Sequence, residues 1–149
     1  MDTEAHLEKF ARFEKCRLLL DPLEDFELWY WSLLSAGTAI INAALHATGI
    51  THEDDSFATQ VPDVYAVPDS PSTWHHEIRH LVDLIHVGMP QIDADLPGPL
   101  KIAFHEMEAI EQYRDPCVRA DRAADTAVVE TIAMAYERCI EATRRALAR

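Results

Sequence analysis

The stretch PLEDFELWYWSLLSAGTAIINAALHAT, residues 22–48, decides the fold class of this chain. Pro22 suits the first position of a helix, and Gly49, directly after the stretch, is a common helix end. Apolar residues recur inside it at alternating steps of three and four, and a second apolar stripe runs beside the first. A helix with two adjacent apolar stripes packs against more than one neighbour. The stretch therefore predicts the central helix of a bundle, and its surplus apolar face predicts a homodimer.

The same stretch is long enough to raise the question of a membrane. No Asp, Glu, Lys or Arg occurs between Leu28 and His52, and such a length can cross a bilayer. Polar residues interrupt it, however, and its flanks, Glu27 and Glu53, are acidic rather than basic. We therefore expect a helix buried by its neighbours, with no membrane as partner.

Helical patterns continue on both sides of this stretch. Their periodicity and end signals predict further helices over about 3–20, 70–87, 100–113 and 121–148. Prolines forbid a helix through residues 50–69, which we expect to form a long crossover loop. The expected fold is a single all-α domain over residues 1–149, a bundle of four main helices plus one shorter helical segment, with a long Pro-containing crossover loop.

Composition limits the function classes. The 149 residues are 48% apolar, and 26 Asp and Glu against 13 Lys and Arg give a formal net charge of -13. This is the composition of a folded domain, and its acidity disfavours a general nucleic-acid binder. Three cysteines without a CxxC pair argue against a disulfide framework, and the first residues lack the apolar core of a signal peptide. We expect a cytoplasmic protein.

The segment WHHEIRHLVDLIH, residues 74–86, contains the string His76-Glu77-x-x-His80. On one helical face, two such histidines can hold zinc while the Glu polarises water. On the expected helix, His76 and His80 point away from the core, about 40° apart, and His86 lies about 120° from His80. A solvated face is therefore the favoured interpretation and we expect no cofactor, but a metal-binding helical bundle that uses His76 and His80 stays an alternative.

The same helical geometry groups His75, Arg79 and His86 at the edge of the core stripe. Arg can hold a phosphate group, and His can move a proton near neutral pH. Arg79 and His86, separated by six residues, resemble the motif of the HEPN superfamily, and so do the second-helix segment 30–49 and residues 113–116. That resemblance implies a small, usually dimeric helical domain that acts as a metal-independent ribonuclease or binds RNA or a nucleotide. Arg79 would then bind phosphate and His86 would act as acid and base, with His75 in support.

The central helix also carries polar residues in one stripe: Ser32, Ser35, Asn42 and His46. Such groups either face solvent, which we favour, or are paired inside the protein. If they share a groove with Arg79, then Asn42 and His46, together with His75, are candidates for binding a substrate. The remaining alternative is a non-enzymatic, antitoxin-like helical dimer that binds a protein partner.

Overall fold

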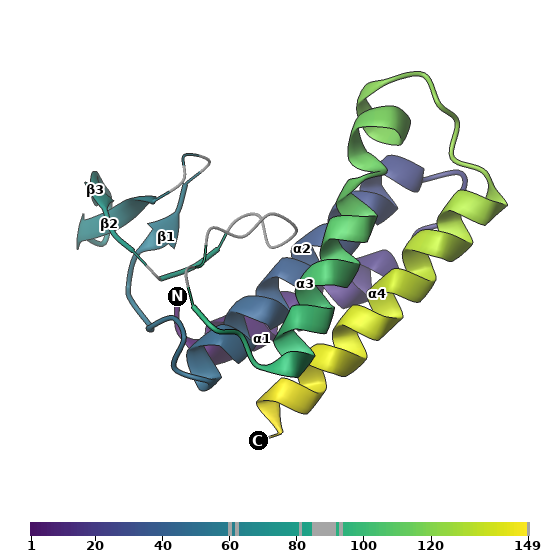
Figure 1. The fold of residues 1–149 in the computed structure, drawn as a ribbon. Helices are drawn as coiled ribbons and strands as arrows, with labels where there is room; N and C mark the ends of the chain where they lie inside the picture. Colours follow the sequence, from purple (N-terminus) through teal and green to yellow (C-terminus); the bar gives the residue numbers. More distant parts are fainter. Residues whose placement is uncertain (60, 62, 81, 85–91, 93, 149) are drawn as a thin grey trace.

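The computed structural model describes the whole chain except residues 60, 62, 81, 85–91, 93 and 149. Within the described residues, α-helices form a bundle and three strands form an antiparallel sheet near one end of it (Figure 1). The helices are α1 (Thr3–Arg17), α2 (Phe26–Ala47), α3 (Gly98–Glu111) and α4 (Thr126–Leu147), with a π-helical turn at Asp115–Arg119. The strands are β1 (Phe57–Ala58), β2 (Val64–Ser70) and β3 (Thr73–Ile78), in the order β1-β2-β3.

The sheet makes the all-α prediction wrong, because this is a mixed α and β structure. Residues 73–78, expected inside the helix 70–87, form strand β3, and part of the expected crossover loop forms β1 and β2. Residues 85–87 of that expected helix lie outside the described residues. Pro71 lies between β2 and β3, where its fixed φ suits a tight turn as well as it suits a helix start. The β2–β3 register pairs Val64 with Ile78 and Val67 with His75.

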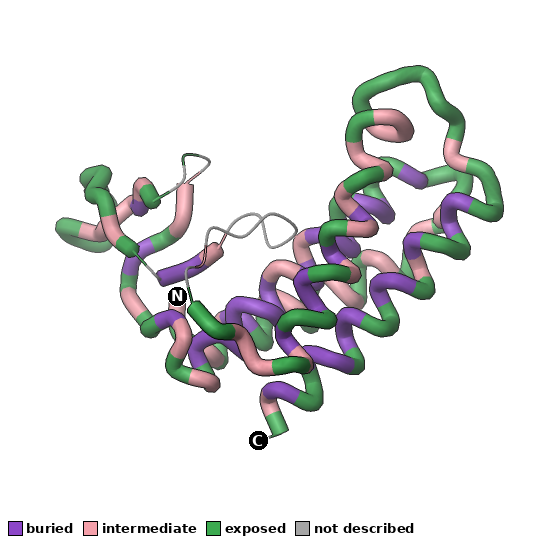
Figure 2. The backbone as a smooth tube through the Cα atoms, viewed as in Figure 1, coloured by how far each residue is buried: buried purple, intermediate pink, exposed green. Residues whose placement is uncertain are grey.

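Helix α2 is the centre of the bundle, and α1, α3 and α4 all pack against it. Figure 2 shows it buried along most of its length, whereas α1 and α4 each expose an outer face. The helix is long and apolar enough to cross a membrane by length and composition, but most of it is covered by its neighbours, as expected of a core helix. Gly37 allows the close approach of α3, since a Cβ there would lie 2.5 Å from Sδ of Met107.

Hydrogen bonds tie the segment that follows the hairpin to the bundle. The side-chain amide of Asn42 donates to the carbonyl oxygen of Leu84 at 2.8 Å, and the backbone N–H of Leu84 donates to the amide oxygen of Asn42 at 2.8 Å. The hydroxyl of Tyr65, the buried residue of β2, donates to the carbonyl oxygen of Asp83 at 2.6 Å. These bonds from α2 and β2 fix the backbone of Asp83 and Leu84, directly after the Asp83 side chain.

Candidate metal centre and adjoining pocket

Two histidines and an aspartate meet at the end of the bundle that carries the sheet. His6 lies in the first turns of α1 and His46 in the last turn of α2. Adjacent helices joined by a short link run antiparallel, so the start of α1 lies beside the end of α2 (Figure 1). Asp83 reaches the same point from the segment after β3. Three segments that are far apart in the sequence therefore each supply one side chain.

The three side chains are in direct contact. Nε2 of His6 lies 2.9 Å from Oδ1 of Asp83, and Nε2 of His46 lies 3.0 Å from the same oxygen. The ligand atoms of the three residues all lie within 4.8 Å of one another, and all three residues are buried. Among the described residues, this is the group of histidine, cysteine and carboxylate side chains with the spacing of a metal site.

The outer atoms of the cluster differ in their partners. Nδ1 of His46 is hydrogen-bonded to Oγ1 of Thr51 at 2.8 Å, which fixes the orientation of the ring. The ammonium group of Met1 donates a hydrogen bond to Oδ2 of Asp83 at 3.0 Å and forms an ion pair with it. Nδ1 of His6 is buried and has no hydrogen-bond partner among the described residues. The ring of His6 is thus held from one side only.

The Asp83 carboxylate is held in its charged form. Burial by itself would raise its pKa, but hydrogen bonds from His46 and His6 act in the opposite direction and prevail, so that its pKa lies well below the usual range. An ionised carboxylate beside two imidazole nitrogens attracts a cation, and this is the electrostatic condition for binding a metal ion.

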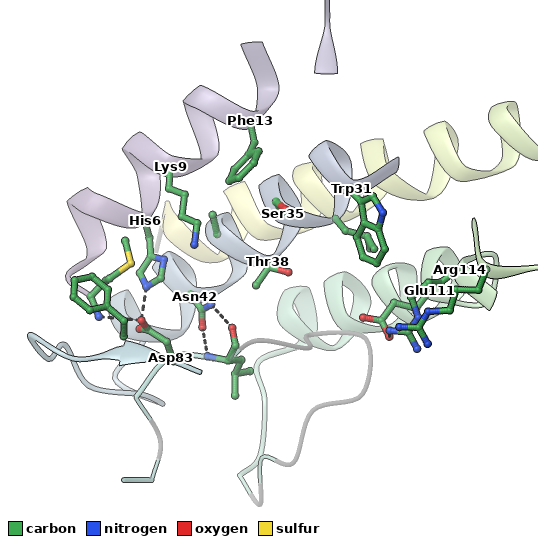
Figure 3. A pocket seen from close by; sticks show the side chains of 17 residues that line it. His6, Lys9, Phe13, Trp31, Ser35, Thr38, Asn42, Asp83, Glu111 and Arg114 are labelled. Carbon is green, nitrogen blue, oxygen red and sulfur yellow. Dashed lines mark hydrogen bonds and ion pairs between the residues drawn. The ribbon is translucent and has the colours of Figure 1, made fainter. Parts of the chain in front are cut away.

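A pocket of about 590 Å³ opens from this cluster. His6 and Asp83 lie at one end of it, as Figure 3 shows, and Trp31, Glu111 and Arg114 lie at the other. The walls between these ends come mainly from α1 and α2. They carry Lys9, Phe13, Leu34, Ser35, Thr38, Ala39 and Asn42.

The residues predicted for RNA chemistry lie elsewhere. Arg79 follows β3 and pairs with the carboxylates of Asp54 and Glu77, and it does not line this pocket. His75 is exposed on β3, with its Nδ1 2.7 Å from Asp69. His86 lies outside the described residues, so its position relative to Arg79 stays a prediction. The helical grouping of His75 with Arg79 is wrong, because residues 73–78 form a strand.

The helical spacing on which the surface metal site depended is wrong for the same reason. His76 lies in β3 and His80 beyond its end, and both side chains are exposed. The favoured solvent-facing interpretation of the polar stripe on α2 is also wrong for Ser32, Asn42 and His46, which are all buried. Asn42 lines the pocket, and His46 belongs to the His6–His46–Asp83 cluster.

Sequence reasoning missed His6, Asp83 and Lys9. The available signal for His6 was its position, because it lies four and seven residues before Phe10 and Phe13 on the apolar side of the first helix. A histidine on such a face is buried and needs a polar partner. Nothing in the sequence identified Asp83 as that partner, since the expected helix placed Asp83 among the histidines of its own segment.

No family model, no curated protein and no solved structure matches this chain. The HEPN resemblance, the ribonuclease activity and RNA binding that it implies, the homodimer and the cytoplasmic location therefore stay predictions. A function for this chain has to be inferred from the geometry of its described residues.

Proposed function

We propose that this protein binds a divalent transition-metal ion through His6, His46 and Asp83 and presents that ion to a small molecule in the adjoining pocket. The observation that carries the proposal is the convergence of the three buried side chains, with two imidazole nitrogens on one carboxylate oxygen. Two histidines and one carboxylate are a ligand set that zinc and ferrous iron both use in proteins.

The distances suit a site that opens slightly to admit an ion. Bonds of about 2.0–2.2 Å from zinc to nitrogen and oxygen ligands place neighbouring ligand atoms about 3.4 Å apart in a tetrahedron. The two nitrogen-to-oxygen distances here are 2.9 and 3.0 Å. Each of these two distances therefore has to widen by a few tenths of an ångström to seat a zinc ion.

Thr51 supports a metal-bound form of His46. When Nε2 of a histidine binds a metal, its Nδ1 carries the proton and donates to a neighbouring oxygen. The Thr51 hydroxyl, 2.8 Å from Nδ1 of His46, can accept a hydrogen bond from Nδ1–H or donate one to an unprotonated Nδ1. Thr51 therefore satisfies Nδ1 of His46 both when Nε2 carries the proton and donates to Asp83 and when Nε2 binds a metal ion.

Three protein ligands leave a coordination position open, which distinguishes catalytic metal sites from closed structural ones. His6 and Asp83 both line the pocket, so the open position is accessible to a ligand there. A metal ion in this place supplies Lewis acidity and lowers the pKa of a bound water. The residues of the chain orient the ion and exclude solvent from its buried side.

The test is a titration of the purified, chelator-treated protein with Zn²⁺ and with Co²⁺, whose visible absorption reports coordination by nitrogen and oxygen. We expect one ion per chain, with binding weakened at least tenfold in His46→Gln and Asp83→Asn. The matched control is the double variant His76→Ala/His80→Ala, which removes two exposed histidines outside the cluster.

Two results would overturn the proposal. One is saturable Co²⁺ binding that the control variant loses and Asp83→Asn keeps. The other is a wild-type protein that stays folded by circular dichroism and binds neither ion, which would leave the cluster as a structural hydrogen-bond network. This second result is measured on the wild type alone, so it does not depend on whether the variants fold.

A further inference from the structure

One face of α2 forms the floor of the pocket. Trp31, Ser35, Thr38 and Asn42 follow one another at steps of four, three and four residues, so they share a face of the helix. The residues that surround this face on the helix are buried in the core. The pocket thus runs along α2 from the His6–His46–Asp83 cluster to the indole of Trp31, with α1 along one side (Figure 3).

Lys9 is the cationic side chain at the cluster end of this pocket, where the Met1 ammonium is already paired with Asp83. It lies one turn after His6 on α1, is partly buried, and points into the pocket (Figure 3). It makes no ion pair with any described residue, although the chain has 26 acidic residues for 13 basic ones. A partly buried ammonium group in an acidic protein is suited to receive an anion from outside.

The cations at the other end of the pocket are already paired. Nε of Arg114 lies 3.3 Å from Oδ1 of Asp115, and Nη1 of Arg119 lies 3.2 Å from the same oxygen. Glu111 adds a further carboxylate there. The positive charge that remains available to a ligand is therefore at the Lys9 end, beside the proposed metal ion.

The middle and the far end of the pocket suit a ligand with an aromatic body. Phe13 and Leu34 supply apolar wall, and the Trp31 indole is partly exposed at the far end. The hydroxyls of Ser35 and Thr38 line the pocket and are partly exposed. Aromatic rings with a polar edge bind favourably on such surfaces, where an indole offers a face for stacking.

We propose that the pocket binds a small aromatic anion, whose carboxylate or phosphate group is held between Lys9 and the metal ion and whose ring lies along α2 toward Trp31. This inference rests on the proposed function, because the metal supplies the second contact to the anion. A small anion is also consistent with the acidic surface, since a compact charge enters a local positive pocket more readily than a long phosphate backbone does.

The test measures the binding of three probes to the zinc-loaded protein by calorimetry: phenylacetate, phenyl phosphate and the neutral 2-phenylethanol. Lys9→Met removes the charge and keeps the length of the side chain, whereas Lys9→Arg restores a charge. The matched control is Lys15→Met, on the same helix, exposed and outside the pocket. Stronger binding of phenylacetate or of phenyl phosphate separates a carboxylate ligand from a phosphate ligand.

We expect saturable binding of at least one anion and weaker binding of the alcohol. Lys9→Met should raise the Kd of the anion about tenfold, Lys9→Arg should recover most of the loss, and Lys15→Met should change nothing. The inference is overturned if no anion binds, if 2-phenylethanol binds as well as the anions, or if Lys9→Met and Lys15→Met have the same effect.

The same titrations without metal separate this inference from the proposed function. If the chain binds no metal but Lys9 still controls anion binding, the proposed function fails while the anion pocket stands. If the metal binds and Lys9→Met leaves anion affinity unchanged, the metal centre stands and the anion pocket is wrong.

Discussion

Nε2 of His46, at the end of the central helix, lies 3.0 Å from Oδ1 of Asp83. Asp83 belongs to the segment that follows strand β3. The bond joins α2 to that segment at a buried point. A carboxylate in such a place is satisfied by imidazole N–H groups or by a metal ion, and in either state it must remain paired. Stability and the proposed metal binding therefore involve the same side chain.

This shared side chain gives the first prediction, for Asp83→Asn. The amide is uncharged and has one acceptor oxygen where the carboxylate has two, so the metal-free protein should lose about 2 kcal/mol of unfolding free energy. At about a hundred times its Kd, Zn²⁺ should stabilise the wild type by about 2.7 kcal/mol and the variant by much less. Urea unfolding with and without Zn²⁺ measures both effects.

Asp69→Asn is the control for this substitution, because Asp69 is an exposed carboxylate that is also 2.7 Å from a histidine nitrogen. It should retain the stabilisation by Zn²⁺ in full. An equal loss of the zinc effect in Asp69→Asn would show that the ion acts on the surface of the hairpin and not at the buried cluster.

The second prediction concerns Thr51, which touches the cluster only through His46. Thr51→Val keeps the shape of the side chain and removes the oxygen that orients the ring. Residues that orient a metal-bound histidine in this way typically change metal affinity by about 10–100-fold. We expect a weaker Zn²⁺ affinity in this range, measured by competition with a chelator of known affinity.

Thr131→Val is the matched control, since the Thr131 hydroxyl donates to a backbone carbonyl oxygen and lies exposed on α4. A merely structural role of Thr51 would lower stability and leave the Kd for Zn²⁺ unchanged. That outcome would mean that Thr51 does not orient His46 for binding the proposed ion.

The third prediction tests the link from the sheet to the site. The Tyr65 hydroxyl donates to the carbonyl oxygen of Asp83 at 2.6 Å. Burial, and to a lesser extent the negative charge of Asp83, raises the pKa of Tyr65 to about 12. The hydroxyl therefore stays protonated, and so remains a donor, at neutral pH. Tyr65→Phe should cost about 1–2 kcal/mol of stability and weaken metal binding, because the backbone at Asp83 loses an anchor. Thermal unfolding and zinc titration measure the two effects.

Tyr113→Phe is the control, because Tyr113 is partly buried between α3 and the π-helical turn, away from Asp83. If Tyr65→Phe weakened the fold but left the affinity for zinc at its wild-type value, the hairpin would be shown to have no part in positioning Asp83.

Most of the helical bundle could be predicted from sequence because its signals are local. The expected helix over residues 22–48 corresponds to α2 (Phe26–Ala47), and the one over 121–148 corresponds to α4 (Thr126–Leu147). Most of their apolar residues pack against neighbours within the bundle, so the hydrophobic period reports the burial pattern. The end signals, such as Gly49 after α2, are local as well.

The hairpin could not be predicted in the same way. Trp74 and Ile78 stand four residues apart and suggested one face of a helix, but both are exposed, 49% and 70%, on β3. Every residue of β3 is exposed, so the strand has no buried face. Its sequence therefore lacks the alternation of apolar and polar residues that identifies a half-buried strand. Its strand state comes instead from pairing with β2, a contact between segments that periodicity does not report.

The candidate site shows the same division between local and long-range information. His46 was identified because it lies in the polar stripe of α2, which is a local pattern. Asp83 acts through contacts with residues 37 and 77 positions earlier in the chain, and no spacing rule covers such distances. Only the folded structure shows which side chains the chain topology brings together.

A partly buried contact joins α1 to α4. Oε1 of Glu14 accepts hydrogen bonds from the Tyr136 hydroxyl at 2.5 Å and from Nε of Arg17 at 2.8 Å. Partial burial would raise the pKa of Glu14, but hydrogen bonds from Arg17 and Tyr136 outweigh it and lower the pKa below its usual value. Because the folded pKa is the lower one, the contribution of Glu14 to stability is complete above the unfolded pKa of about 4.3 and disappears as the pH falls through the folded pKa.

The last prediction follows from this pH dependence and concerns Glu14→Gln. The substitution should cost about 1 kcal/mol at pH 7 and progressively less below about pH 4, when urea unfolding of both proteins is followed across that range. Glu8→Gln, exposed on the same helix and 3.9 Å from Arg12, should match the wild type throughout. A cost of Glu14→Gln that stayed constant down to low pH would mean that packing, and not the charge of Glu14, joins α1 to α4.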